Sequence, residues 1–214
     1  KLSIFKISIF VFFLISANVS AEIIKVFEFT EEELTTLKVR KVKGKTKWTL
    51  GSNDNGNYIR AEAEGTGSGL GKEISIDLRK TPYINITWKI EKDLSGIVEN
   101  SKKGHDFAAR VFVVKKTGST ALSNRAVNYV FSSNSLVDEY WRSPYTKKSI
   151  DYVLSTTKNN LNEWVTVKAN VKEHFKKLHN LDVDTINGVA IMTDTDNSKL
   201  KAISYYQNIY FSSE

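Results

Sequence analysis

Apolar and polar residues alternate along much of this chain, and that two-residue period restricts its fold more than any other feature. Segment 84–91 alternates Ile, Ile, Trp and Ile with Asn, Thr, Lys and Glu, and segments 58–64 and 73–79 follow the same pattern. Because successive side chains of a β-strand point to opposite faces, such segments predict strands with one buried face and one exposed face. Antiparallel sheets commonly have this arrangement.

Short strands with turns between them account for most of the remaining sequence. Gly, Asn, Asp and Ser gather at 51–56, 65–69 and 194–198, where we expect turns. Since helices do not alternate regularly with the strands, the sequence predicts an all-β fold: one antiparallel β-sandwich of the jelly-roll type over residues 22–214. Further strands are predicted at 23–29, 37–43, 107–115, 126–132, 150–156, 163–169, 186–193 and 203–211.

One or two short helices are expected beside the strands. Thr30 is an N-cap residue for a helical turn at about 31–34, and Glu33 is placed to complete a capping box. A second helix is predicted at about 171–179, because its apolar residues fall on one stripe. The stripe consists of Val171, Phe175 and Leu178.

The first twenty-one residues predict export. Lys1 and Lys6 accompany an apolar run at 7–15, and the small residues within 16–21 lead to a cleavage point before Glu22. This is the pattern of a secretory signal peptide, so we expect the protein to be periplasmic or secreted. An uncleaved membrane anchor is the alternative, but a membrane span needs about 20 apolar residues and this run is shorter.

The composition predicts a soluble, monomeric domain without disulfides. The chain has no cysteine and a formal net charge of +7, of which Lys1 and Lys6 supply two. Much of the basic excess lies at 38–47, which holds six basic residues and no acidic one. This run is either a contact for an acidic polysaccharide or another polyanion, or a lysine-rich edge strand. Aromatic residues do not interleave with its charges, so we do not expect nucleic-acid binding.

Arg110 is the first candidate for ligand binding. It lies between Ala109 and Val111 in an apolar strand, on the same side of that strand as Asp106. A buried arginine needs a carboxylate partner. Arg110 is therefore either half of a structural ion pair, or it presents its guanidinium to a ligand.

Asp194, Asp196 and Asn197 form the candidate metal site. They follow an apolar strand, with the two aspartates on one side and Asn197 at the start of a turn. Two carboxylates and an amide oxygen resemble part of a calcium shell, which takes about six to eight oxygens. The alternatives are residues that only form the turn, or a pair of carboxylates that act as acid and base in glycoside cleavage.

Trp141 is the preferred contact for a sugar, because it lies in the aromatic-rich loop 138–145. Exposed aromatic rings can stack on the apolar faces of sugars. The alternative is an aromatic lid that closes the end of the sandwich. Trp88 and Trp164 lie within strand patterns and are predicted to belong to the core.

Several segments resemble DUF3047, a bacterial family of exported domains of unknown function. They are spread over about 48–211, and the segment 188–197, which contains Met-Thr-Asp-Thr-Asp-Asn, is the most specific of them. The resemblance implies a jelly-roll sandwich similar to carbohydrate-binding modules, and it supplies no established activity. The chain departs from the family pattern at His105, Phe131 and His174, where Asp, Trp and Asp are usual.

Together these features predict an exported, non-catalytic carbohydrate-binding module. The alternatives are a polysaccharide-acting hydrolase or lyase that uses acidic residues, and a structural envelope protein. The sequence has no zinc-ligand spacing, no Gly-x-Ser-x-Gly elbow and no phosphate-binding loop. The predicted ligand-binding residues are Asp106, Arg110, Asn128, Tyr129, Trp141 and Tyr206, and a calcium ion would lie at Asp194, Asp196 and Asn197.

Export gives the first testable prediction. When the complete chain is expressed in a bacterial host, the recovered soluble protein should begin at Glu22, because signal peptidase accepts the small residues that precede it. N-terminal sequencing and intact mass measure this directly. A product that keeps residues 1–21 and sediments with membranes would contradict cleavage and support the anchor.

Overall fold

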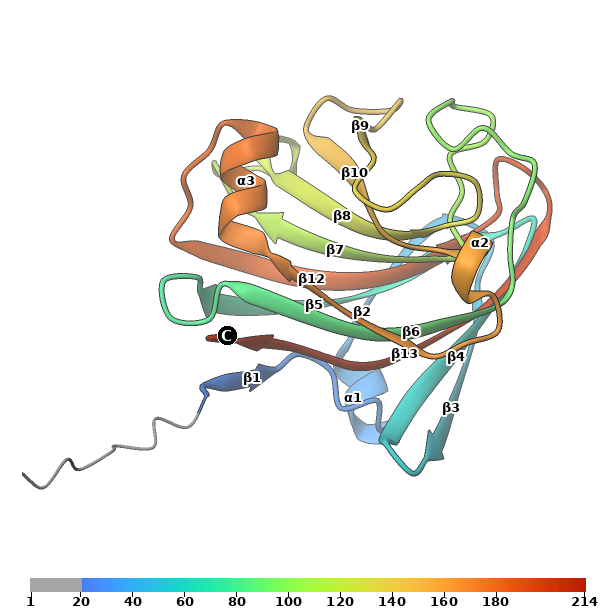
Figure 1. Cartoon of the computed structure of the whole chain (residues 1–214), viewed down its shortest axis with the longest axis horizontal. Coiled ribbons are helices and arrows are strands. Elements are labelled where there is room, and N and C mark those ends of the chain that lie inside the picture. The colour runs from blue at the N-terminus through green and yellow to red at the C-terminus, as the bar shows by residue number, and fades with distance from the viewer. Residues whose placement is uncertain (1–20) are drawn as a thin grey trace, which may run out of the picture.

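The computed structural model describes residues 21–214, and within them two β-sheets pack face to face (Figure 1). The predicted signal peptide, apart from Ala21, lies outside the described residues. The helices lie at the margins of the sheets (Figure 1). None of the helices within residues 21–214 has the length and apolar character needed to cross a membrane. The predicted β-sandwich is confirmed.

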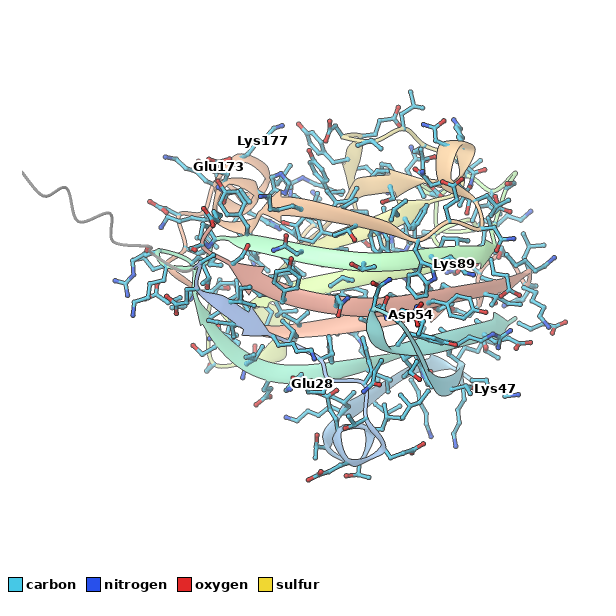
Figure 2. All side chains as sticks on the ribbon, turned by 60° about the horizontal axis from the view of Figure 1, so that its bottom comes forward. Glu28, Lys47, Asp54, Lys89, Glu173 and Lys177 are labelled. Atoms are coloured by element: carbon cyan, nitrogen blue, oxygen red, sulfur yellow. The ribbon has the colours of Figure 1, made fainter. Side chains whose placement is uncertain are left out.

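One layer, which we name sheet A, is antiparallel throughout its described strands. Its order is β11–β6–β13–β4–β3, and β1 pairs with the last residues of β13. Because each strand alternates, one face of sheet A packs on the core and the outer face bears polar side chains (Figure 2). The bounds are β1 Ile23–Lys25, β3 Lys47–Asn53, β4 Gly56–Glu64, β6 Tyr83–Lys92, β11 Val165–Asn170 and β13 Lys201–Ser212.

The second layer, sheet B, is mixed rather than purely antiparallel. Its order is β2–β5–β12–β7–β8–β10–β9, and β8 pairs in parallel with β10. The connection 133–148 is long enough to return the chain to the end where β8 began, and it contributes the short strand β9. The bounds are β2 Lys38–Lys43, β5 Gly67–Asp77, β7 Ala109–Lys115, β8 Arg125–Ser132, β9 Tyr140–Arg142, β10 Ser149–Thr156 and β12 Thr185–Asp194.

The core lies between the sheets, and two polar aromatic residues of sheet A reach across it. Trp88 donates a hydrogen bond from Nε1 to Ser155 Oγ on β10, at 2.9 Å. Tyr206 donates from its hydroxyl to the carbonyl of Met192 on β12, at 2.6 Å. Neither aromatic side chain is accessible to solvent, so these bonds satisfy groups that would otherwise be buried unpaired. Apolar side chains fill the space around them, among them Ile84, Ile86, Val111, Val113 and Ile191.

Helix α1 (Glu31–Thr36) begins at the predicted N-cap but does not form the predicted capping box. The Thr30 side chain accepts a hydrogen bond from the backbone N–H of Glu33, at 3.2 Å. The Glu33 carboxylate accepts from the N–H groups of Phe29 and Glu28, each at 2.8 Å, instead of from Thr30. The box is therefore displaced by one residue toward the N-terminus.

Helix α3 (Val171–His179) has the predicted bounds. Asn170 is its N-cap and accepts from the N–H of Glu173, at 3.1 Å. The predicted stripe, which includes Phe175, is buried against the core. The prediction of one or two helices was too low for the described chain, because α2 (Thr157–Asn160) and a 3₁₀ turn at Ala121–Ser123 are too short to show a period.

The structure corrects three predictions of strand and core. The sequence pattern did not predict β3 or β9, and the turn predicted at 65–69 gives way to β5 from Gly67 onward. Glycine-rich strands lack the side chains on which the alternation depends. Trp164 precedes β11 and is 36% exposed, so the prediction that it belongs to the core is wrong.

Packing of α3 generates a stability prediction. Phe175→Ala should lower the free energy of unfolding by about 3–5 kcal/mol, because a fully buried ring leaves a cavity in the core. Lys176→Ala, at the adjacent exposed position, should change it by less than about 0.5 kcal/mol. Urea denaturation of both variants measures the difference, and equal losses would contradict the placement of α3.

Candidate functional site

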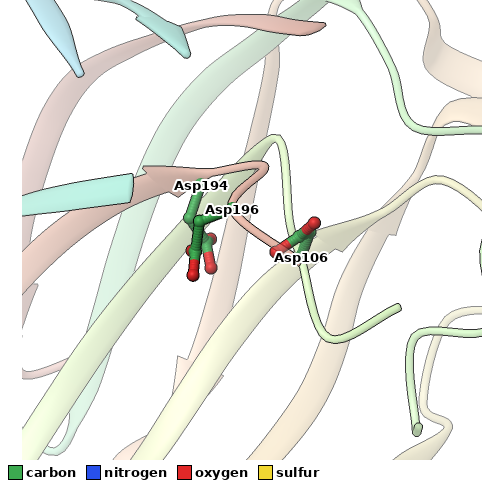
Figure 3. Close-up of side chains that lie close together, drawn as sticks. All are labelled: Asp106, Asp194 and Asp196. Atoms are coloured by element: carbon green, nitrogen blue, oxygen red, sulfur yellow. The ribbon is translucent and has the colours of Figure 1, made fainter. Parts of the chain in front are cut away.

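Three aspartates from separate parts of the chain meet at one end of sheet B. Asp194 ends β12, Asp196 lies in the turn that follows, and Asp106 lies shortly before β7. One carboxylate oxygen from each lies within 4.8 Å of the other two (Figure 3). Asp106 and Asp194 are buried, and Asp196 is half-buried. We name these three residues the acidic cluster.

Asp106 holds the turn that follows β12. Its carboxylate accepts hydrogen bonds from the backbone N–H of Asn197 at 3.1 Å, from Asn197 Nδ2 at 2.9 Å and from the N–H of Ser198 at 2.5 Å. The amide oxygen of Asn197 accepts from the Tyr145 hydroxyl, at 2.6 Å. Asn197 thus anchors the turn rather than completing the predicted metal site, and Asp106 takes its place beside Asp194 and Asp196.

Arg110 pairs with Asp194, which is the carboxylate partner that burial of the arginine requires. Arg110 donates from Nη2 to Asp194 Oδ2, and the residue is only 4% exposed. The guanidinium carbon lies 5.0 Å from the ring centroid of Phe107 and 5.2 Å from that of Phe112. Enclosed in this way, Arg110 belongs to a structural ion pair, which is the first of the two alternatives that the sequence left open.

Burial shifts the protonation of Asp194. Loss of solvent raises its pKa to about 7, and the nearby carboxylates of Asp106 and Asp196 act in the same direction, whereas Arg110 opposes the rise. If all three aspartates were ionised, the acidic cluster would carry three negative charges, and the single guanidinium of Arg110 would balance only one of them. Protonation of Asp194 reduces this imbalance.

Glycine makes room for the acidic cluster. A Cβ atom on Gly67 of β5 would lie 2.6 Å from Asp196 Oδ1 and 2.9 Å from Asp194 Cβ. Any side chain at this position would collide with the two aspartates. The glycine-rich start of β5 is thus explained by close packing against the end of β12.

A cation is the group that the acidic cluster could hold. Asp196 Oδ1 is buried and has no hydrogen-bond partner within the described residues. Carboxylate oxygens in close approach suit a hard divalent cation such as calcium. Asp106, Asp194 and Asp196 would be the ligands, but Asp106 and Asp194 already accept protein hydrogen bonds, so the cluster is also a self-sufficient part of the fold.

The predicted ligand contacts Asn128, Tyr129 and Tyr206 are buried and engaged within the protein. Asn128 Nδ2 donates to Asp151 Oδ1 at 2.8 Å, and Asp151 Oδ2 bonds His105 Nε2 at 2.7 Å. Neither tyrosine has accessible surface, and Tyr206 bridges the sheets as described above. Side chains enclosed to this extent cannot stack on a sugar in this conformation.

Tyr129 pairs instead with His174 of α3. Its hydroxyl lies 3.1 Å from His174 Nδ1. Burial lowers the pKa of His174 to about 4, and the charge of Lys177 adds to this effect. The imidazole is therefore neutral near pH 7 and can serve as a hydrogen-bond partner inside the sandwich.

Trp141 of β9 lies against the face of sheet B that points away from sheet A. It packs with Phe107, Val130 and Val153 in a small apolar cluster, and its ring is stacked 6.3 Å from that of Phe107. Trp141 is half-buried. Its ring therefore covers part of this outer face and does not close the end of the space between the sheets, as the predicted lid would.

A different set of aromatic residues is displayed on the outer face of sheet A. Tyr58 of β4, Trp164 and Tyr205 of β13 touch one another, with ring centroids 5.6–5.8 Å apart. Trp164 is exposed, and the two tyrosines are half-buried. We name these three residues the aromatic triad. Gly51 of β3 lies under Tyr58, where a Cβ would approach the ring to 2.4 Å.

Polar and cationic groups surround the aromatic triad. Lys89 Nζ of β6 lies 4.8 Å from the centroid of Tyr205 and 5.9 Å from that of Trp164, on the face shown in Figure 2. Beside the triad an open depression of about 320 Å³ is lined by polar residues of β6, β11 and β13 and by β1. Its lining residues are Ile23, Lys25, Thr87, Thr166, Asn208 and Tyr210.

The sequence contained a signal for this face. Tyr58 and Tyr205 occupy the polar phase of strands whose other phase is buried, which predicts that their rings are exposed. Trp164 gave no such signal, because it lies just outside β11. Its contact with residues of β4 and β13 depends on the order of strands in the sheet.

Comparison with models of known protein families identifies the family of this chain. A family model described as "Protein of unknown function (DUF3047)" matches residues 32–210. The chain belongs to this family. The resemblance that the sequence suggested is thus confirmed, and a comparison with curated proteins finds no significant match.

Solved structures share the fold of this DUF3047 domain. The family 30 carbohydrate-binding module of the cellulosomal cellulase Cel9D-Cel44B of Clostridium thermocellum has a TM-score of 0.53 at 10% identity, over 90% of this chain and 98% of that chain. The family 11 module of the same organism, in complex with a β-1,3-1,4-mixed-linked tetrasaccharide, has a TM-score of 0.47 at 13% identity, over 88% and 94%. At 10% identity, the similarity to the family 30 module shows the fold alone, which is a jelly-roll sandwich.

The buried ion pair generates a prediction with a pH dependence. The folded pKa of Asp194, about 7, lies above its ordinary value of 3.8, so this group's contribution to stability falls as pH rises from about 4 to 7. Arg110→Ala removes the charge that opposes the shift. It should cost about 3–5 kcal/mol at pH 8 and clearly less at pH 5, where Asp194 is mostly protonated.

Denaturant unfolding of Arg110→Ala at both pH values measures this, with Arg79→Ala as the matched control. Arg79 pairs with Asp77 on the surface, so its loss should change the free energy of unfolding little at either pH. An Arg110→Ala penalty that is the same at pH 5 and pH 8 would contradict the role of Asp194.

Proposed function

We propose that this protein binds carbohydrate without cleaving it, and that the aromatic triad is the binding surface. The observation that carries the proposal is the exposure of Trp164 beside Tyr58 and Tyr205 on the outer face of sheet A. Aromatic rings are usually buried, and a group of them on a sheet face marks a site of interaction. Their broad apolar surfaces suit the C–H faces of sugar rings.

Hydrogen-bonding groups lie where a chain of sugars would extend from the triad. The depression beside it presents the hydroxyls of Thr87 and Thr166, which lie 2.8 Å apart, and the polar ends of Asn208 and Tyr210. A site that combines apolar contact with a few polar groups fixes both the affinity and the orientation of its ligand. An oligosaccharide needs both.

The state of the carboxylates favours binding over catalysis. Glycoside cleavage requires two carboxyl groups that flank the scissile bond. Asp106 and Asp194 are buried and bonded to the protein, and on the outer face of sheet A Glu62 bonds Arg60 while Glu91 bonds Tyr205. Each of these carboxylates has a structural partner, which supports a non-catalytic role. Asp196 Oδ1 has none, but it is buried beside Asp194, whose own carboxylate is paired with Arg110.

The fold and the expected location fit this proposal. The family 30 module that shares the fold is a carbohydrate-binding module by name, and low identity limits that similarity to the architecture. Export past the cytoplasmic membrane, as residues 1–21 predict, would bring the domain to the polysaccharides of the envelope or the surroundings. A calcium ion at the acidic cluster would then stabilise the sandwich without contacting the sugar.

Substitution in the aromatic triad tests the proposal. A glycan array followed by calorimetric titration with the strongest oligosaccharide should show binding by the wild type. Trp164→Ala should weaken it at least about tenfold, because central aromatic contacts carry most of the binding energy. Trp141→Ala, at the position that the sequence favoured, should bind like the wild type.

Thermal unfolding separates loss of binding from loss of fold. Trp164 is 36% exposed and lies outside the core, so its substitution by Ala should lower the melting temperature much less than Phe175→Ala does. If Trp141→Ala abolishes binding and Trp164→Ala does not, the site lies on sheet B and the proposal is wrong. Absence of binding to every glycan on the array would equally overturn it.

A further inference from the structure

Two lysines on the outer face of sheet A flank the depression beside the aromatic triad. Thr87 of β6 pairs with Thr166 of β11, and Lys89 lies two residues from Thr87 on the same face. Lys168 lies two residues from Thr166 on β11 and pairs with Asn85 of β6. Measured along β6, Lys168 and Lys89 therefore lie on opposite sides of Thr87. The two lysines therefore lie on either side of the threonine pair, about 13 Å apart along β6.

Neither lysine is neutralised within the part of the chain that the structure describes. Other cations of this face have carboxylate partners: Arg60 pairs with Glu62 at 2.8 Å, and Lys25 pairs with Glu28 at 2.5 Å. Lys89 and Lys168 have no such partner among the described residues, and each ammonium group lies over an aromatic ring. The positive charge at the depression is thus available to a ligand.

Aromatic rings hold both ammonium groups in place. Lys89 Nζ lies 4.8 Å from the centroid of Tyr205, and Lys168 Nζ lies 5.2 Å from that of Tyr83. Cation–π contact of this kind restrains a flexible lysine side chain while leaving its hydrogen-bond donors free. A charge that is already positioned loses less entropy when an anion binds.

We infer that the ligand of this face is an acidic polysaccharide, whose anionic groups bind Lys89 and Lys168 while its sugar rings stack on the aromatic triad. This inference rests on the proposed function, since it concerns the same surface. A polymer that carries anionic groups at regular intervals can reach both lysines across the threonine pair. A neutral glycan would gain no electrostatic attraction from the two lysines.

The basic segment of β2 competes as an explanation for polyanion binding, and the structure argues against it. β2 is one of the two edge strands of sheet B, and all six of its residues are exposed. Charge on an edge strand discourages pairing with another chain. None of the aromatic residues of the triad lies on sheet B, so β2 offers charge without a surface for the sugar ring.

Matched glycans and matched lysines test the inference. The array should contain polyuronates beside their methyl esters and sulfated glycans beside their desulfated forms, so that each pair differs only in charge. We expect the wild type to prefer the acidic member at low ionic strength. Lys89→Gln and Lys168→Gln should each reduce that preference by about threefold to fivefold. Lys41→Gln on β2 should preserve it.

Each outcome decides a different point. Equal binding of acidic and neutral members, weakened by Trp164→Ala, would overturn this inference and leave the proposed function intact. A preference that falls as much in Lys41→Gln as in Lys89→Gln would assign it to overall charge and also overturn the inference. No binding to any member would overturn both. A preference confined to carboxylated or to sulfated glycans would identify the anionic group.

Discussion

Burial of alternate side chains between the two sheets is the constraint on which the rest of this structure depends. In β6, Trp88 has no accessible surface, while Lys89 lies on the outer face. In β13, Tyr206 bonds across the core and Tyr205 joins the aromatic triad. A shift of register by one residue would exchange inner and outer side chains in each strand. The register of each strand therefore determines both which side chains form the core and which lie on the proposed binding face.

The polar residues that look most like a functional site in the sequence have partners within the fold. Arg110 and Asp194 neutralise each other inside sheet B, and Asp106 ties the turn that follows β12. Buried charges of this kind must be paired, so they attract the same residue types as an active site does. Exposure is the observation by which we distinguish the two cases, and it is the reason for proposing the aromatic triad of sheet A as the interaction surface.

Much of the fold could be predicted from the sequence, and little of the candidate site. Alternation located β6 and β4 closely, and the apolar stripe located α3 at its observed bounds. It could not locate the start of β5, because glycine removes the side chains that carry the pattern. β3 was not predicted because only Trp48 and Leu50 alternate before its glycine, which is too short a pattern. The sequence places Trp164 in the core, but the residue is 36% exposed. Its position beside a strand could not predict its contacts with Tyr58 and Tyr205, which lie on other strands.

The sequence by itself determined which side chains of a strand share a face, because that depends only on the two-residue period of a β-strand. It also required that Arg110 find a carboxylate, because a buried charge cannot stay unpaired. Only the tertiary structure decided that the partner is Asp194, and that Tyr58, Trp164 and Tyr205 meet on one exposed face. Those contacts join residues far apart along the chain, so they follow from the order and packing of the strands and not from any local pattern.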